Sequence, residues 1–229
     1  MVEYYSGEPR YLVAVDCVIF GFDKDKLKLL VVKRAREPQI GEWSLMGGFL
    51  QENETLEEAA QRILTKWTGL ENVFLEQFFN FSKLNRDPGE RVLSMAFFAL
   101  IKIDESDKEL TKSHNAEWFE IDAIPGLIFD HGKMVEMALG IIRHKCRFEP
   151  IGFELLPQKF TIPQLQKLYE AILQQKLDNA NFRKKILSMK ILHKLNEKEK
   201  EFSKRGAFYY MFDQGKYKKL NESGSLFEI

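Results

Sequence analysis

Three carboxylates follow a pair of glycines in the first third of the chain, and their oxygens could bind a metal cation. Gly47 and Gly48 lead into Glu54, Glu57 and Glu58. Carboxylate oxygens are the ligands that Mg²⁺ prefers, and a bound magnesium polarises a phosphate for attack by water. The alternative role is structural, because acidic side chains near the start of a helix interact favourably with the helix dipole. We favour the structural role for these glutamates.

A helix must position these carboxylates, and the sequence marks both of its ends. Thr55, followed three residues later by Glu58, predicts a capping box at the start, and Gly69 predicts the end. Between them, apolar side chains recur at helical spacing. They are Leu56, Ala59, Ala60, Ile63 and Leu64. The segment therefore predicts a glycine-containing loop followed by an amphipathic helix.

The spacing of this loop and helix resembles the Nudix box, Gly-x5-Glu-x7-Arg-Glu-U-x-Glu-Glu-x-Gly-U, in which U is aliphatic. The matching residues are Gly48, Glu54, Arg62, Gly69 and Leu70. The preceding segment, residues 43–48, resembles the usual lead-in Trp-x-Leu-Pro-Gly-Gly, with Met46 in place of the proline. The resemblance implies a Nudix fold.

The departures from the box remove its metal ligands. In Nudix hydrolases three glutamates on one helix face hold the magnesium, and here Ile63, Lys66 and Trp67 occupy those positions. A hard cation needs anionic oxygen ligands, which these side chains lack. We therefore expect no metal, no cofactor, no catalytic residue and no enzymatic activity. The alternative hypothesis is an active hydrolase of a nucleoside diphosphate derivative.

Length and composition fit a soluble globular protein with one large domain or two small ones. The chain has 229 residues, of which 45% are hydrophobic and 13% aromatic, enough for a buried core. It has no apolar run of membrane-spanning length and no signal-peptide pattern, so we expect a cytoplasmic location and no membrane partner. Cys17 and Cys146 lack metal-ligand neighbours at standard spacing, and we expect them to be buried and reduced.

The charge is distributed unevenly along the chain. Residues 1–149 carry 19 Lys+Arg against 25 Asp+Glu, a net −6, whereas residues 150–229 carry 15 against 9, a net +6. This asymmetry predicts two domains, 1–148 and 149–229, the second of which faces a polyanion. Residues 146–157, with two prolines, are the predicted connector.

Strands and helices alternate in the first predicted domain. The predicted strands are Tyr11–Phe20, Leu27–Val32, Val73–Phe81, Arg91–Ile103 and Trp118–Glu120, and a helix is predicted over Gly132–Lys145. A mixed sheet with helices on both faces is an α/β/α sandwich, as a Nudix fold requires.

The second predicted domain has the pattern of a winged helix-turn-helix. A helix over Thr161–Gln174, a break at 176–179 and a basic helix over 181–189 are followed by a hairpin of 191–195 with 207–212, whose charged tip spans 196–205. The residues expected to bind DNA are Asn181, Arg183, Lys184, Lys185, Lys204 and Arg205. Because one such helix covers only a few base pairs, we expect a homodimer on a pseudo-palindromic operator.

Segments beyond the box resemble the Nudix-type bacterial transcription regulators, which join a Nudix domain to a winged helix-turn-helix. The matching segments are 86–88, 92–94, 129–131, 155–157, 160–161, 165–166, 169–171, 181–184 and the region around Arg205. They cover nearly the whole chain. One branch of this family responds to ADP-ribose and governs NAD metabolism, whereas another responds to sugars such as L-arabinose. Residues 41–49 and 149–153 resemble the arabinose branch more.

We therefore expect a ligand-responsive regulator whose effector is a neutral pentose, with ADP-ribose as the alternative. Losing the metal carboxylates removes the main reason to expect a diphosphate, and aromatic side chains near the box suit a sugar. The residues expected to bind the effector are Asp16, Lys33, Arg34, Glu42, Trp43, Gly48, Phe49, Trp67, Arg86 and His131.

Two of these residues have structural alternatives. Asp16 lies inside an apolar strand, where a carboxylate is rarely buried unpaired, so it either forms structural hydrogen bonds or contacts the ligand. His131, like His114, has no acidic cluster at metal-site spacing, and a lone histidine is more often a hydrogen-bonded structural residue.

Overall fold

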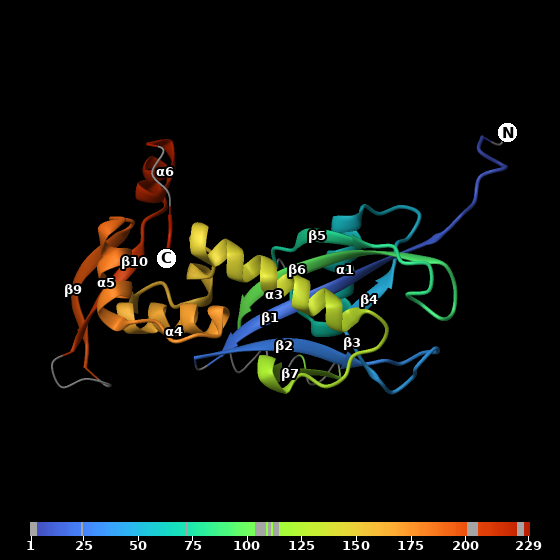
Figure 1. Cartoon of the computed structure of the whole chain (residues 1–229), viewed down its shortest axis with the longest axis horizontal. Coiled ribbons are helices and arrows are strands. Elements are labelled where there is room, and N and C mark those ends of the chain that lie inside the picture. The colour runs from blue at the N-terminus through green and yellow to red at the C-terminus, as the bar shows by residue number, and fades with distance from the viewer. Residues whose placement is uncertain are drawn as a thin grey trace.

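The computed structural model describes residues 4–23, 25–71, 73–103, 109, 111, 115–200, 206–223 and 227–229, so that His114, Lys204 and Arg205 lie outside the described residues. The N-terminal part contains β1 (Leu12–Asp23), β2 (Lys26–Lys33), β3 (Trp43–Ser44), β4 (Met46–Phe49), α1 (Leu56–Thr68), β5 (Glu76–Phe81), β6 (Val92–Lys102), β7 (Ala116–Glu120), η1 (Ile121–Ala123) and α3 (His131–Phe148). The C-terminal part contains η2 (Phe153–Leu155), β8 (Phe160–Thr161), α4 (Ile162–Leu173), α5 (Asn179–Ser188), β9 (Leu192–Glu199), β10 (Ala207–Phe212) and α6 (Gln214–Glu222). Figure 1 shows the two parts in succession along the long axis of the molecule.

The N-terminal part is built on one mixed sheet with β1 at its centre. Its main path runs β3-β2-β1-β6-β5, while β4 also pairs with β1 and β7 with β2. β1 runs parallel to β6 and antiparallel to β2 and β4. Pairing with β6 continues to Phe22 opposite Lys102, which is why β1 extends beyond its predicted end at Phe20. β5 starts at Glu76 rather than at Val73, because its pairing with β6 begins there.

Helices cover both faces of this sheet, which confirms the predicted α/β/α sandwich. Alternate side chains of a strand point to opposite faces. Cys17 and Ile19 of β1 therefore join the core beneath α1, whereas Val18 and Phe20 join the core beneath α3. Both cysteines are buried and form no disulfide, as predicted. Burial raises the pKa of the Cys146 thiol to about 12.

The C-terminal part is a winged helix, as predicted. α4 begins with a capping box formed by Thr161 and Gln164, and Asp178 caps α5. β9 and β10 pair as the hairpin, and β8 pairs with the other side of β10. β9 extends to Glu199, which pairs with Ala207, so that residues 196–199 belong to the strand and not to the predicted tip. α6 has no counterpart among the predicted helices, because its two partly buried apolar residues, Tyr217 and Leu220, are too few to give a helical pattern in the sequence.

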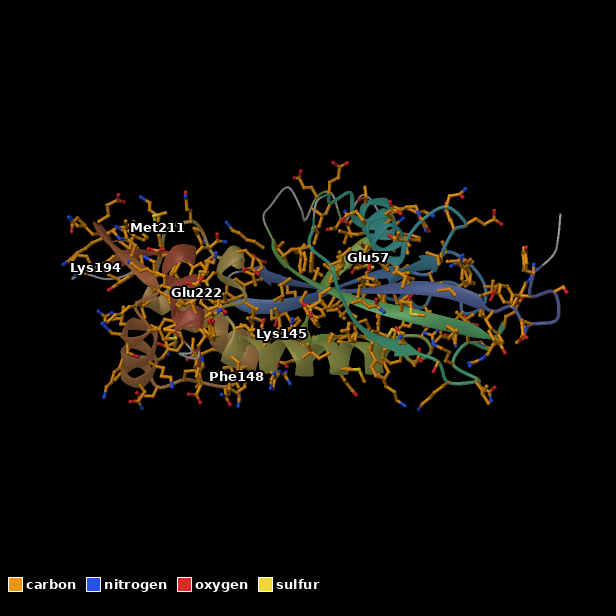
Figure 2. All side chains as sticks on the ribbon, turned by 90° about the horizontal axis from the view of Figure 1, so that it is seen from above. Glu57, Lys145, Phe148, Lys194, Met211 and Glu222 are labelled. Atoms are coloured by element: carbon orange, nitrogen blue, oxygen red, sulfur yellow. The ribbon has the colours of Figure 1, made fainter. Side chains whose placement is uncertain are left out.

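The last turns of α3 connect the two parts. Figure 2 shows Lys145 and Phe148 near the middle of the long axis. Lys145 Nζ lies 2.6 Å from Glu76 Oε1 of the sheet, and Arg143 Nε donates to the carbonyl of Ile172 in α4 at 3.2 Å. α3 ends at Phe148, the predicted domain boundary, but one buried core continues from the sheet into α4. The division into two domains therefore stays a prediction. Within the part of the chain that the structure describes, no helix is long and apolar enough to cross a membrane.

Candidate functional site

A cavity of about 450 Å³ opens beside the glycine-containing loop, at one end of the sheet. Its walls come from β1, β4 and α1, together with the segment that follows β2 and the segments that precede β6 and α3. Seven of the ten residues predicted to bind the effector line it: Asp16, Arg34, Gly48, Phe49, Trp67, Arg86 and His131. The glycines allow a close approach of the backbone, since a Cβ at Gly47 would collide with Asp16 Oδ1.

The other three predicted residues do not line the cavity. Lys33 pairs with Trp43 across β2 and β3, next to the pair of Val32 and Ser44. Val32 and Ser44 line the cavity, so the alternation of the strands turns Lys33 and Trp43 to the opposite face. There Lys33 Nζ lies 4.0 Å from the centroid of the Trp43 ring. Glu42, the third, is exposed in the turn before β3.

The floor of the cavity is a buried network of charged and polar side chains. Arg86 makes a two-point ion pair with Asp130, with Nη2–Oδ1 at 2.7 Å and Nε–Oδ2 at 3.1 Å. Its Nη2 also lies 3.6 Å from Asp16 Oδ2, to which the hydroxyl of Ser94 donates at 2.5 Å. All four side chains are largely buried. Asp16 therefore has the structural partners that its buried position requires.

His131 occupies the same network as a neutral imidazole. The backbone N–H of Leu45 donates to His131 Nδ1 at 3.1 Å, which assigns the ring proton to Nε2. Nε2 lies 3.7 Å from Asp16 Oδ1. Burial lowers the pKa of His131 and outweighs the opposing effect of Asp16, while Arg86 lowers the pKa further. The residue is 3% exposed, so a proton added to its ring would be poorly solvated.

We expect the protein to lose stability as the pH falls below about 6.5, the pKa of an unfolded histidine. Because the pKa of His131 is lower in the folded state, the unfolded state takes up the histidine proton first as the pH falls. The contribution of the neutral ring to stability therefore declines between the pKa of the unfolded state and that of the folded state. Thermal melts at several pH values between roughly 7.5 and 5 measure this decline. It should be smaller in His131→Asn, which keeps an acceptor for Leu45 but does not titrate.

His144→Asn is the matched control, because it removes an exposed imidazole from the same helix. If the Tm of His131→Asn falls with acid as much as that of the unmodified protein, His131 is not the cause of the decline.

Two of the three glutamates after the glycine pair, Glu54 and Glu58, have structural roles. Glu58 accepts the N–H of Thr55 at 2.7 Å, which completes the predicted capping box. Glu54 forms a two-point ion pair with Arg62, whose Nε donates to Oε2 at 2.7 Å. The pKa of Glu54 is lowered chiefly by this hydrogen bond. Arg62 also donates to the carbonyl of Phe49 at 3.1 Å, so the pair ties the loop to α1.

The cavity-facing side of α1 does not fit a magnesium ion. Ile63, Lys66 and Trp67 line the cavity at the positions where the Nudix box has glutamates. Their contacting groups are a methyl, an ammonium and an indole, none of which is an anionic oxygen donor. Among the described residues, no group of three or more His, Cys, Asp and Glu side chains could hold a metal.

Cations and aromatic rings surround the mouth of the cavity instead. Arg34 stacks over Phe129, with 5.2 Å between the guanidinium carbon and the ring centroid, and Arg36 stacks over Phe49 at 5.1 Å. The ammonium of Lys66 lies 5.4 Å from a ring of Trp67. Such a site can bind an anion between its cations and pack a flat ring system against its aromatic side chains.

Sequence reasoning missed several residues of this site. They are Ser44, Lys66, Asp87, Phe129, Ser94 and Asp130, of which the first four line the cavity and the last two support it. Phe129 and Asp130 lie in a segment that supported the family resemblance, which is a signal that could have found them. Lys66 was interpreted only as an ammonium that cannot bind a metal, and not as a partner for an anion.

Four of the six predicted DNA-binding residues lie on the exposed side of α5. Asn181, Arg183 and Lys184 are exposed in its first two turns, as an interface requires. Lys185 is also exposed, but its Nζ pairs with Glu228 Oε2 at 3.1 Å. The assignment of these residues to DNA stays a prediction, as does that of Lys204 and Arg205 outside the described residues.

Comparison with known proteins identifies a related family for each of the two parts of the molecule. Residues 10–137 match the family model of the NUDIX domain, and residues 152–212 match that of the NrtR DNA-binding winged helix domain. The ADPR responsive transcriptional repressor NtrR of Acinetobacter baylyi is 30% identical over 211 residues, which cover 90% of this chain and 84% of that protein.

Solved structures show the same arrangement. NrtR of Shewanella oneidensis complexed with a 27mer DNA has a TM-score of 0.77 and 26% identity, and the match covers 90% of this chain and 95% of that one. The NUDIX domain of that protein complexed with ADP ribose has a TM-score of 0.53 and 25% identity, covering 61% of this chain and 94% of that one.

The expectation of a pentose effector is wrong. The Acinetobacter relative responds to ADP-ribose, and the Shewanella NUDIX domain binds it. The inference failed because it treated the loss of the metal carboxylates as the loss of diphosphate binding, whereas Arg34, Arg36 and Lys66 provide positive charge at the cavity without a metal.

Proposed function

Since the chain belongs to the family of transcriptional regulators that join a Nudix domain to an NrtR-type winged helix domain, we propose that it is an ADP-ribose-responsive repressor. The winged helix binds an operator, and ADP-ribose bound in the Nudix cavity releases it. ADP-ribose was the alternative effector considered from the sequence.

The observation that carries this proposal is the combination of cations and aromatic rings around one cavity. Arg34, Arg36 and Lys66 line it, and no described carboxylate lies within 4.0 Å of their charged nitrogens. A diphosphate carries negative charge that these side chains can neutralise by charge-assisted hydrogen bonds. Phe49 and Trp67 offer apolar faces of the kind that pack against an adenine ring. A neutral sugar would bring no negative charge to these cations.

We propose further that the protein does not hydrolyse its effector. The α1 positions that hold magnesium in Nudix hydrolases lack oxygen donors, and Glu54 and Glu58 are engaged in structural hydrogen bonds. A bound ADP-ribose would therefore meet no metal-activated water and would persist as a signal.

α3 is the element through which the cavity can influence the winged helix. Asp130, its N-cap residue, and His131, its first residue, belong to the network beneath the cavity. Near its other end, Arg143 donates to Ile172 of α4. A ligand that favours one position of α3 shifts the population of winged-helix arrangements by its difference in affinity between the two states.

The proposal includes a cytoplasmic homodimer, because one α5 helix reads only a few base pairs and two related by a dyad read a useful operator. Analytical ultracentrifugation of the protein with a duplex tests the stoichiometry. Two protomers per operator are expected, and one protomer that binds a half-site as tightly as a full operator would contradict the dimer.

The function is tested with a duplex that the protein itself selects from a random pool. Micromolar ADP-ribose is expected to raise the Tm and to release the duplex in a gel shift, with L-arabinose as the matched negative ligand. If ADP-ribose changes neither the Tm nor the gel shift, the proposed effector is wrong. Incubation with magnesium tests the second proposal, and turnover of ADP-ribose at roughly one per second or faster would contradict it.

A further inference from the structure

A groove lined by positive charge crosses the winged helix, far from the effector cavity. It lies between α5, the hairpin and α6. Its five cations come from four segments: Arg183, Lys190, Lys194, Lys216 and Lys219. Between them lie the apolar side chains Leu187, Met189, Leu192, Tyr210 and Leu220. Among the described residues that line this basic groove there is no carboxylate.

Most cations of the basic groove make no ion pair with a described carboxylate. Some exposed lysines elsewhere do make one, as in Lys26–Glu120 at 2.6 Å and Lys159–Glu197 at 2.5 Å. Within the groove, Lys194 Nζ lies 3.7 Å from the centroid of the Phe208 ring. In the groove, Lys216 pairs with Asp213 at 3.3 Å. No other described carboxylate lies within 4.0 Å of the remaining four groove cations: Arg183, Lys190, Lys194 and Lys219. Like charges gathered in this way repel one another unless an anion lies between them.

The position of the basic groove indicates which anion. Arg183 and Leu187 are one turn apart on α5, the helix expected to enter the major groove of DNA, and Lys194 lies on the wing strand β9. Figure 2 shows Lys194 at the end of the molecule that carries the hairpin, and Figure 1 places α6 at that same end. A duplex that contacts both α5 and the wing would bring its backbone to the groove between them.

We propose that the basic groove binds the phosphate backbone of DNA and that α6 contributes phosphate contacts through Lys216 and Lys219. The proposal rests on the DNA-binding function proposed above. It extends the interface to a helix that lies outside residues 152–212, the range that matches the winged helix domain. Phosphate contacts orient a protein on the duplex without distinguishing sequences, so α6 strengthens binding to operator and to unrelated DNA alike.

The test compares neighbouring lysines of α6 by fluorescence anisotropy with the full-length protein. Lys219→Gln removes a charge from the groove, whereas Lys218→Gln removes one from a side chain that lines a separate hollow with Pro150 and Phe153. The probe is a duplex of random sequence, about 30 base pairs long, because phosphate contacts need no operator. Binding is measured between about 50 and 200 mM salt, the range in which counterion release is evident.

The double variant Lys216→Gln/Lys219→Gln is expected to show a shallower salt dependence, by about 0.9 in the slope of log K against log salt for each phosphate that it no longer neutralises. At about 0.1 M salt this corresponds to a roughly tenfold weaker affinity for each such phosphate. Lys218→Gln should differ far less, and Lys216→Arg/Lys219→Arg should keep the affinity.

If the double variant has the slope and affinity of the unmodified protein, the role of α6 is overturned while DNA binding stands. If the unmodified protein binds no duplex at any of these salt concentrations, both this inference and the proposed function fail. All the substituted lysines are exposed, so unaltered Tm values and unaltered responses to ADP-ribose are expected.

Discussion

Replacing Arg86 with methionine is expected to lower the free energy of unfolding by about 3–5 kcal/mol, because it leaves two buried carboxylates without their shared cation. Arg86 is 7% exposed and holds Asp130 by two hydrogen bonds, while Asp16 lies 3.6 Å away. Methionine fills much of the same volume, so the loss is chiefly electrostatic. Urea unfolding followed by circular dichroism measures the effect.

The second variant in this series, Arg86→Met/Asp130→Asn, should recover part of the lost stability, since one of the uncompensated charges is removed as well. Arg62→Met is the comparison variant, because the Arg62 side chain is 33% exposed against 3% for Arg86, while the carboxylate partners of the two arginines are buried to a similar extent. It should cost less than Arg86→Met, since solvent reaches the Arg62–Glu54 pair from the arginine side. If Arg86→Met and Arg62→Met lose the same free energy of unfolding, the burial of the Arg86 network does not determine how much it contributes to stability.

ADP-ribose is expected to bind Lys66→Gln about 10–100-fold more weakly than the unmodified protein, because a hydrogen bond to a charged group contributes about 1.5–3 kcal/mol. The ammonium of Lys66 is one of the cations at the cavity that can meet the diphosphate. Isothermal titration calorimetry measures the affinity, and the release of the selected duplex should require correspondingly more ADP-ribose.

Lys33→Gln is the control for Lys66→Gln, because it removes the same charge from a side chain on the other face of the sheet. Its affinity for ADP-ribose should be unchanged. Chelating divalent cations with EDTA should also leave the affinity of the unmodified protein unchanged, since the cations that meet the diphosphate belong to side chains. Equal effects of Lys33→Gln and Lys66→Gln would remove Lys66 from the binding site.

The sequence by itself determined those features that depend on neighbours in the chain. Thr55 with Glu58 and the final Gly69 specify α1 through hydrogen bonds that span a few residues, and all of these are present in the structure. The replacement of three glutamates by Ile63, Lys66 and Trp67 is likewise visible from spacing alone. Local sequence patterns were sufficient to predict the two helices and the hairpin of the winged helix. They were not sufficient to predict α6 or the full length of β9.

Only the tertiary structure decided which of the candidate side chains share the cavity. Lys33 and Arg34 are adjacent basic residues, yet the pleat of β2 turns Lys33 to the Trp43 side and leaves Arg34 at the cavity. Arg86 and Asp130 meet across 44 residues of sequence, a contact that no local pattern encodes.

The chemistry of the effector could not be predicted from the sequence, because it too depends on side chains that come together only in the folded protein. In the sequence, Lys66 is a missing metal ligand, whereas in the structure it lines one cavity with Arg34 and Arg36. Electrostatic complementarity is a property of charges brought together in space, and α1 and the segment after β2 are brought together only by packing on the shared sheet. The replacement of the three glutamates was therefore evident from spacing, while the cationic lining of the cavity was not.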